Sequence, residues 1–368
     1  MNSMKYLVTA GLMAITAASA CAQSGGTDDW PAADALLEEV RQTDQMPGVM
    51  AAVVRDGEVI WSRATGFADL ENRLALTTRT RMRIGSVSKP LTAALVLRLA
   101  DAGRLDLDAS IHDYVPEITA PRSGAITPRM IAGHVSGIRQ YDFTSIEDAN
   151  NFLYYPTLAM AFERLTDDPL ISTPGEEFHY SSIAYNVLGI AAERAGGAGF
   201  AELMQQEITG PLSMDDTRID HPLEVIDRRT RFYTLFPDGV VLNTIWRDSS
   251  DYYPSGGMLS SAEDLALFAD ALFESELLSS EMQDVLRTEI RMTSGESSGY
   301  AFGWQAIYDE SGVFSHFEHG GETNGGYAYV RFDPHSGTAL AMIANANHAV
   351  GEPIFFEAAS ERLPAIFE

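Results

Sequence analysis

Residues 84–90 read Ile84-Gly85-Ser86-Val87-Ser88-Lys89-Pro90 and place a serine three residues before a lysine. The apolar stretch from about Val87 to Ala102 predicts a helix that ends at Gly103. Because three residues make nearly one helical turn, Ser86 and Lys89 share a face of that helix. A serine hydroxyl becomes a good nucleophile only when a neighbouring base takes its proton. The segment therefore predicts a nucleophile, Ser86, beside its base, Lys89.

Lysine is almost absent from the chain. Of its 25 lysines and arginines, only Lys5 and Lys89 are lysines. Arginine stays protonated, whereas a buried lysine can lose its proton and act as a base. A Ser-x-x-Lys pattern arises by chance in many chains, but in a chain this poor in lysine it points to chemistry. Ser88 is the alternative nucleophile, although it adjoins Lys89 and belongs to another part of the helix surface.

The composition is that of a globular protein. The chain has 368 residues, of which 45% are hydrophobic, enough for one large core or two linked cores. Its net charge of -27 repels phosphate backbones and anionic lipid surfaces, which argues against a nucleic-acid partner. The histidines lack metal-ligand spacing, and the sequence contains no phosphate loop or dinucleotide fingerprint. We therefore expect neither a metal nor a cofactor, and the oligomeric state stays open.

Residues 1–22 have the pattern of a secretory signal peptide. Lys5 gives a positive start, residues 6–18 are apolar but too few to span a membrane, and small residues follow. Two cleavage patterns compete: Ala20-Cys21-Ala22 fits the small-x-small rule, whereas Ala18-Ser19-Ala20-Cys21 resembles a lipoprotein box that would lipidate Cys21. We expect an exported protein, either periplasmic or anchored to the membrane by an N-terminal lipid. Cys21 is the only cysteine, which excludes a disulfide, a thiolate metal site and a cysteine nucleophile.

Strand patterns occur at both ends of the chain. Val49–Val54 and Val59–Thr65 flank the hairpin signal Asp56-Gly57. Four more segments alternate as strands do, and they span residues 301–308, 313–318, 327–332 and 338–344. Helical patterns cover residues 30–45, 183–195 and 262–273, and a last helix is expected from about residue 352.

This order predicts an α+β fold. Antiparallel strands from both chain ends form one sheet flanked by helices, and a mainly helical region is inserted between them. We expect a single catalytic domain over residues 30–368. Its α/β part spans about 30–113 and 290–368, and its helical part spans about 114–289. The active site is expected in the cleft between the two parts.

Several segments in order resemble one enzyme family, that of class C β-lactamases, D-alanyl-D-alanine carboxypeptidases and related serine esterases, with their penicillin-binding-protein-like fold. The resemblance covers roughly residues 30 to 350. It rests on Ser86-Val87-Ser88-Lys89, Gly133-His134-Val135-Ser136-Gly137-Ile138, Pro174-Gly175-Glu176, Tyr180-Ser181-Ser182, the segment Gly-Gly-Met-Leu-Ser-Ser-Ala-Glu-Asp-Leu at residues 256–265, and His319-Gly320-Gly321.

The resemblance implies a role for each of these positions. Ser86 would form the acyl-enzyme, and Lys89 and Tyr180 would share the proton transfers. His319 is expected to orient Tyr180 or to contact the substrate. The oxyanion hole would consist of the backbone N–H groups of Ser86 and Glu322. The glycines of the third motif, Gly320 and Gly321, would let the chain approach the substrate closely.

Two positions depart from the family pattern. Ser182 stands where the second motif usually has asparagine, whose amide recognises the amide of β-lactams and peptides. Gly320 stands where the third motif often has a hydroxyl that holds a substrate carboxylate. We therefore expect a serine hydrolase of short-chain esters or small amides. The alternatives are a D-amino-acid peptidase or carboxypeptidase, a β-lactamase, a slow-turnover penicillin-binding-like receptor, and a non-catalytic binding module.

A second serine motif is rejected on its context. Residues 295–299 read Gly-Glu-Ser-Ser-Gly and match the nucleophile elbow of α/β-hydrolases. That motif requires an apolar strand before the serine and a helix after it. Here a polar, helix-like stretch precedes it and a strand pattern follows, so we interpret the segment as a loop.

Overall fold

A computed structural model describes residues 30–142, 145, 148, 152–274 and 277–367 of the chain. The expected signal peptide, residues 1–22, and Cys21 lie outside the described residues. Within the described ranges, no helix is both long and apolar enough to cross a bilayer.

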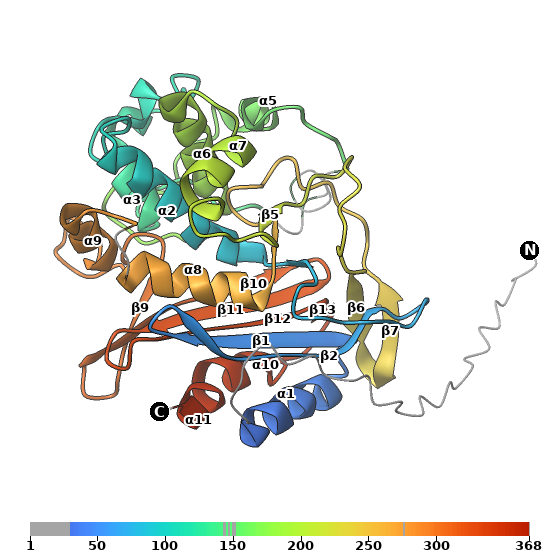
Figure 1. Ribbon diagram of the computed structural model, residues 1–368. Coiled ribbons are helices and arrows are strands. Elements are labelled where there is room, and N and C mark those ends of the chain that lie inside the picture. The colour runs from blue at the N-terminus through green and yellow to red at the C-terminus, as the bar shows by residue number, and fades with distance from the viewer. Residues whose placement is uncertain (1–29, 143–144, 146–147, 149–151, 275–276, 368) are drawn as a thin grey trace, which may run out of the picture.

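The centre of the fold is a seven-stranded antiparallel sheet in the order β3-β2-β1-β12-β11-β10-β9 (Figure 1). Its strands are β1 (Gly48–Arg55), β2 (Glu58–Asp69), β3 (Leu74–Ala75), β9 (Gln305–Tyr308), β10 (Phe314–Thr323), β11 (Gly326–Asp333) and β12 (Thr338–Ala344). Strand β1 pairs with β12, so that Val49 lies opposite Ala344 and Arg55 opposite Thr338. The two ends of the chain therefore share one sheet, which confirms the predicted α+β fold.

The predicted first hairpin is present. Asp56 and Gly57 connect β1 to β2 with φ angles of 53° and 77°, the left-handed values that a tight two-residue turn requires. At the other end, β9 begins only at Gln305, four residues later than predicted. The reason is a turn at Gly303, whose φ is +86° and where an added Cβ would lie 2.3 Å from Ala93 Cβ.

Helices and short helical turns (η) make up the flanking layers. They are α1 (Pro31–Thr43), η1 (Gly85–Val87), α2 (Ser88–Asp101), η2 (Ile111–Asp113), η3 (Ser123–Ala125), α3 (Pro128–Ala132), α5 (Leu158–Phe162), η4 (Glu163–Leu165), α6 (Ser182–Gly196), α7 (Phe200–Met204), η5 (Gln205–Thr209), η6 (Pro237–Gly239), α8 (Ala262–Glu274), α9 (Ser280–Arg287), α10 (Phe355–Glu357), η7 (Ala358–Arg362) and α11 (Pro364–Phe367). Two small sheets complete the fold in the orders β13-β6-β7 and β4-β8-β5. Their strands are β4 (Met82–Arg83), β5 (Arg218–Ile219), β6 (Tyr233–Phe236), β7 (Val240–Asn243), β8 (Met258–Ser260) and β13 (Ala346–His348).

The layers do not follow the expected division by residue range. Helices α1, α10 and α11 cover one face of the large sheet, and α8 packs on the other face against β1 and β12 (Figure 1). Helix α8 comes from the range 114–289 that was expected to form the helical part. Helix α2, from the range assigned to the sheet part, packs instead against α6. The chain thus passes between the two parts more than once.

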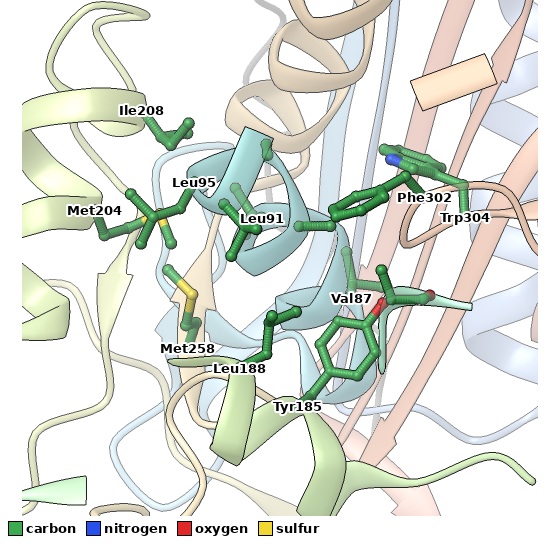
Figure 2. Packing of buried hydrophobic residues seen from close by; sticks show 14 of the residues in the cluster. Val87, Leu91, Leu95, Tyr185, Leu188, Met204, Ile208, Met258, Phe302 and Trp304 are labelled. Carbon is green, nitrogen blue, oxygen red and sulfur yellow. The ribbon is translucent and has the colours of Figure 1, made fainter. Parts of the chain in front are cut away.

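Helix α2 is buried on all sides. Leu91 and Leu95 are fully buried among apolar side chains from α6, α7 and η5 and from the segment before β9 (Figure 2). Each large apolar side chain buried in this way contributes about 1.5–3 kcal/mol. The helix that begins with the Ser86–Lys89 segment is therefore rigidly held, and a polar group on it is removed from water.

Candidate active site

Glycines allow the turn η1 to press against strand β10. Gly85 has a φ of +50°, and a Cβ at this position would lie 2.9 Å from the backbone nitrogen of Glu322. A Cβ at Gly321 would lie 2.2 Å from the carbonyl oxygen of Ile84. These distances are too short for any other residue, so both positions need glycine. The close approach brings the backbone of Gly85, which precedes Ser86, against that of Glu322, the two segments from which the expected oxyanion hole would be built.

The structure brings the predicted nucleophile and base together. Lys89 is 0% exposed, and its Nζ lies 3.0 Å from Ser86 Oγ and 2.8 Å from the carbonyl oxygen of Ser255. Burial lowers the pKa of Lys89 well below its ordinary value of 10.5. Desolvation disfavours the ammonium form, so the neutral amine is available to accept a proton from the serine.

Tyr180 completes the cluster. Its hydroxyl forms a hydrogen bond with the side chain of Ser86, and its ring centroid lies 4.7 Å from Lys89 Nζ. Burial raises the pKa of Tyr180 to about 12, with the hydrogen bond from Ser86 opposing the shift. The phenol therefore stays protonated at neutral pH and is able to donate a proton, while Lys89 accepts one. A serine flanked by an acid and a base can react through an acyl intermediate.

His319 lies behind the cluster rather than in it. Its Nδ1–H donates to the carbonyl oxygen of Gly320 at 2.7 Å, and its buried Nε2 has no hydrogen-bond partner among the described residues. Burial and the nearby Lys89 lower the pKa of His319 to about 3, so the ring is neutral. Its ring centroid is 6.4 Å from that of Tyr180, so His319 adjoins Tyr180, and its Nε2 makes no hydrogen bond to it.

An open cavity of about 590 Å³ leads to Ser86. Of the predicted substrate-binding residues, Ser182 and Glu322 are among the described residues that line it, whereas Gly320 and Gly321 are not. Gly320 faces the opposite side of the sheet, where an added Cβ would lie 3.6 Å from Phe356, and Gly321 packs under Ile84. These two glycines shape the strand without contacting the cavity.

Gln140 lines the same cavity and was missed by the sequence reasoning. Its Oε1 accepts hydrogen bonds from the backbone nitrogens of Tyr141 and Ser182, both at 2.9 Å. Because two N–H groups point at this oxygen, the amide orientation is determined and Nε2 is left on the other side, 3.4 Å from Ser182 Oγ. In the sequence, Gln140 could have been noticed from its position two residues after the Gly133–Ile138 motif. Only the fold places it beside Ser182.

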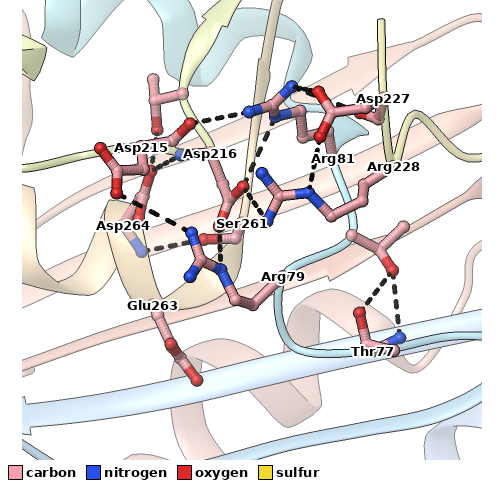
Figure 3. A network of polar contacts seen from close by, with 12 residues as sticks. Thr77, Arg79, Arg81, Asp215, Asp216, Asp227, Arg228, Ser261, Glu263 and Asp264 are labelled. Atoms are coloured by element: carbon pink, nitrogen blue, oxygen red, sulfur yellow. Dashed lines mark hydrogen bonds and ion pairs between the residues drawn. The ribbon is translucent and has the colours of Figure 1, made fainter.

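A polar network anchors the segment at residues 256–265 (Figure 3). Asp264 accepts hydrogen bonds from the nitrogen of Asp216 at 2.9 Å and from Thr217 Oγ1 at 2.8 Å. Asp216 in turn pairs with Arg79 at 2.8 Å and with Arg228 at 2.9 Å. The network ties α8 to the small sheet β4-β8-β5, and β8 follows directly after the loop that supplies the Ser255 carbonyl to Lys89.

The second serine motif, at residues 295–299, forms turns and an isolated bridge between Arg291 and Ser297 rather than a strand–helix elbow. The described residues also contain no group of three or more His, Cys, Asp or Glu side chains arranged to hold a metal.

The family model described as Beta-lactamase matches residues 33–356. The chain belongs to this family. Among curated relatives, the human serine beta-lactamase-like protein LACTB, mitochondrial, is 29% identical over 302 residues, which cover 64% of this chain and 55% of the relative. The chain thus spans about half the length of this relative.

Solved structures of the family share the fold. D-amino acid amidase from Ochrobactrum anthropi SV3 superposes with a TM-score of 0.76 and 22% identity, covering 91% of this chain and 98% of the amidase. EstCE1, a hydrolase with promiscuous acyltransferase activity, superposes with a TM-score of 0.70 and 19% identity, covering 91% of this chain and 96% of EstCE1. At these identities the likeness concerns the fold. Together with the family match, it makes this chain a beta-lactamase-family serine hydrolase.

Proposed function

We propose that the protein hydrolyses short-chain esters and small amides through an acyl-enzyme on Ser86. The observation that carries this proposal is the position of Lys89 Nζ, fully buried and 3.0 Å from Ser86 Oγ. A neutral amine at hydrogen-bonding distance is the base that an uncharged serine needs.

In the acylation step, Ser86 Oγ attacks the carbonyl carbon of the substrate and its proton passes to Lys89 Nζ. The negative charge that develops on the carbonyl oxygen is stabilised by the backbone N–H groups of Ser86 and Glu322. Tyr180 then donates its proton to the leaving alcohol or amine as the acyl bond to Ser86 forms. Lys89 returns a proton to Tyr180, so the cluster ends the step in its starting state.

In the deacylation step, a water molecule takes the place of the leaving group. The same cluster removes a proton from the water and returns one to Ser86 Oγ when the acyl bond breaks. The products are a carboxylic acid and the free enzyme. A slow deacylation step would give the alternative behaviour, that of a penicillin-binding-like receptor.

The substrate class is supported by what lies around Ser86. Ser182 is too short to reach a β-lactam side-chain amide as asparagine does, whereas Gln140 offers its Nε2 donors at the same wall of the cavity. An acyl group that carries an additional carbonyl oxygen can accept a hydrogen bond from Gln140 Nε2. A short-chain ester without such a group can also occupy the cavity. The likeness to an amidase and to the hydrolase EstCE1 supports both kinds of substrate.

The test is turnover of a p-nitrophenyl butyrate ester, a D-amino-acid amide and a chromogenic cephalosporin by the purified mature protein. Ester or amide turnover that disappears in Ser86→Ala supports the proposal. Cephalosporin turnover at a comparable rate would show that Ser182 does not restrict the substrate. Turnover that survives in Ser86→Ala would refute the assigned nucleophile, and a stoichiometric burst without turnover would indicate the receptor.

A further inference from the structure

Arg247 lines the cavity that leads to Ser86, and it lies four residues after strand β7. Its side chain is only 11% exposed. The guanidinium carbon lies 4.2 Å from the ring centroid of Tyr252 and 5.9 Å from that of Tyr141. Stacking on aromatic rings holds the plane of a guanidinium in place without using any of its N–H donors.

The guanidinium keeps unused hydrogen-bonding capacity. Nε and Nη2 of Arg247 are buried; Nε has no hydrogen-bond acceptor among the described residues, and Nη2 interacts with Asp251 over a long distance. Nη2 lies 3.7 Å from a carboxylate oxygen of Asp251, which is also 3.5 Å from Arg164. One carboxylate is therefore shared between two arginines. Because this contact is long, a ligand that supplied closer acceptors to the guanidinium would gain affinity.

Arg247 also remains charged. Burial alone would lower its pKa, but Tyr252, Asp251 and Tyr141 outweigh this effect and the pKa is raised. Among the described residues that line the cavity, the charged ones are Arg247 and Glu322. Lys89 lies behind the wall, fully buried, so Arg247 is the cation that a substrate in this cavity meets.

A second cavity, of about 580 Å³, is also lined by Arg247. Its described lining contains four arginines, at positions 83, 229, 231 and 247, against the acids Asp220 and Glu224. Arg83 and Arg229 both pair with Asp220, at 2.8 and 3.0 Å, so arginines outnumber acids in this lining although the chain has a net charge of -27. Low-dielectric walls concentrate such a field inside a cleft.

We propose that Arg247 binds a carboxylate of the substrate, so that the enzyme prefers anionic esters or amides over neutral ones of the same size. Arginine offers paired donors that match the two oxygens of a carboxylate. Strand β10 offers no hydroxyl for this purpose, because Gly320 has no side chain and faces Phe356. In this chain, Arg247 would therefore bind the acidic group that a hydroxyl of the third motif binds in the family pattern. The inference rests on the proposed function, because it names a substrate class for the Ser86 site.

The experiment compares matched pairs of esters. Mono-p-nitrophenyl adipate and p-nitrophenyl hexanoate carry the same six-carbon acyl chain with and without a terminal carboxylate. The butyrate esters of 4-hydroxyphenylacetic acid and of its methyl ester place the same difference in the leaving group. We expect the wild-type enzyme to have the higher kcat/KM for the anionic member of at least one pair. Arg247→Gln should lower that anionic-to-neutral ratio about tenfold or more, and Arg247→Lys should lower it less.

Arg122→Gln is the matched control, because it makes the same change in net charge at an exposed residue that lines neither cavity. It should keep the wild-type ratio. A ratio that Arg247→Gln leaves unchanged in both pairs, or that Arg122→Gln lowers equally, overturns the proposal. If Arg247→Gln does not fold, the anionic-to-neutral ratio of Arg247→Lys tests the proposal instead, because lysine keeps the positive charge and loses the paired donors.

A binding measurement separates this inference from the proposed function. Calorimetry with mono-p-nitrophenyl adipate and p-nitrophenyl hexanoate on Ser86→Ala needs no turnover. Tighter binding of the adipate, lost in the Ser86→Ala, Arg247→Gln double variant, supports Arg247 even if no ester is hydrolysed. Equal affinities within this pair and within the pair of butyrate esters, measured in the same way, overturn the inference, even if Ser86 is the nucleophile.

Discussion

The side-chain oxygen of Gln140 lies 2.9 Å from the backbone nitrogen of Ser182, at the position where the family pattern has an asparagine side chain. The amide that the second motif lacks is therefore present on a neighbouring segment of chain. Gln140 reaches the cavity from the loop after Gly133–Ile138, and its two acceptor contacts leave Nε2 as the group that a substrate can meet.

Gln140→Glu should lower turnover of acyl groups that contain an amide. A carboxylate oxygen still accepts from the nitrogens of Tyr141 and Ser182, but the Nε2 donors are lost. We expect the ratio of kcat/KM for the p-nitrophenyl ester of N-acetylglycine over p-nitrophenyl butyrate to fall about tenfold, the worth of one hydrogen bond. Gln140→Ala should lower the same ratio. An unchanged ratio in both variants would contradict a role for the amide.

Lys89→Arg should abolish most activity. Arginine keeps its proton, so the base is lost although the positive charge is retained. General-base catalysis contributes about 10²–10⁴-fold, which sets the expected loss of kcat for p-nitrophenyl butyrate. Lys89→Met serves as the control for folding, because methionine fits an apolar site without a charge. Near-normal turnover by either folded variant, checked by circular dichroism, would refute Lys89 as the base.

The pH dependence of kcat/KM should show an acidic limb and a late alkaline limb. The pKa of Lys89 is lowered by burial, so the neutral amine forms as the pH rises through a value well below 10.5, and activity rises with it. Tyr180 loses its proton only near its raised pKa of about 12, so activity should not decline before about pH 10. A stopped-flow pH profile with a non-ionising ester measures both limbs. An alkaline decline between pH 7 and 9 would contradict the assigned acid.

Asp264→Asn should change how stability depends on pH. Burial raises the pKa of Asp264 from 3.8 to about 6, despite hydrogen bonds from Thr217 and Asp216. The folded protein therefore binds the proton more tightly than the unfolded chain. This contribution is fully present below pH 3.8 and is lost as the pH rises through about 6. Asparagine keeps one oxygen for both donors and does not titrate.

The measurement is urea unfolding of the wild type and Asp264→Asn at pH 4 and pH 7. The free energy of unfolding of the wild type should fall relative to the variant on going to pH 7, by about 2 kcal/mol. Glu263→Gln is the control, because it changes a carboxyl of the same helix that accepts a hydrogen bond from Ser62 and lies outside the network of Asp216. A difference that is the same at both pH values would show that Asp264 is ionised throughout.

Cys21→Ser should reveal how the N-terminus is processed. If the lipoprotein pattern is used, the mature wild-type chain begins at Cys21, carries added lipid mass and fractionates with membranes, and the variant does not. Mass spectrometry and fractionation of the full-length protein, expressed in a Gram-negative host, give both readings. A mature chain that begins at Gln23 would support export without an anchor. A chain that retains residues 1–22 would contradict export.

Local patterns in the sequence determined much of the fold. The hairpin at Asp56-Gly57, the helix after Ser86 and the strand at residues 338–344 follow from turn chemistry and periodicity, which act over a few residues. The pairing of Ser86 with Lys89 was also predictable, because a spacing of three residues across the turn η1 and the start of α2 brings their side chains together. The strand predicted at residues 313–318 is shorter than β10, which continues to Thr323, because the glycines of the third motif interrupt the alternating pattern.

Tertiary structure alone decided how the site is completed. The carbonyl of Ser255 that holds Lys89 is 166 residues away from it in the chain, and Gln140 is 42 residues from Ser182. Contacts of this length leave no periodic pattern in a sequence, since neither residue type is unusual in its own segment. Arg247 is similar: as one arginine among many, it becomes distinctive only when the fold stacks it on Tyr252 and buries its donors beside the cavity. The sequence alone determined the chemistry of the nucleophile and its base, because those residues lie three apart in consecutive helical turns, and the packing of distant segments decided which groups face the substrate.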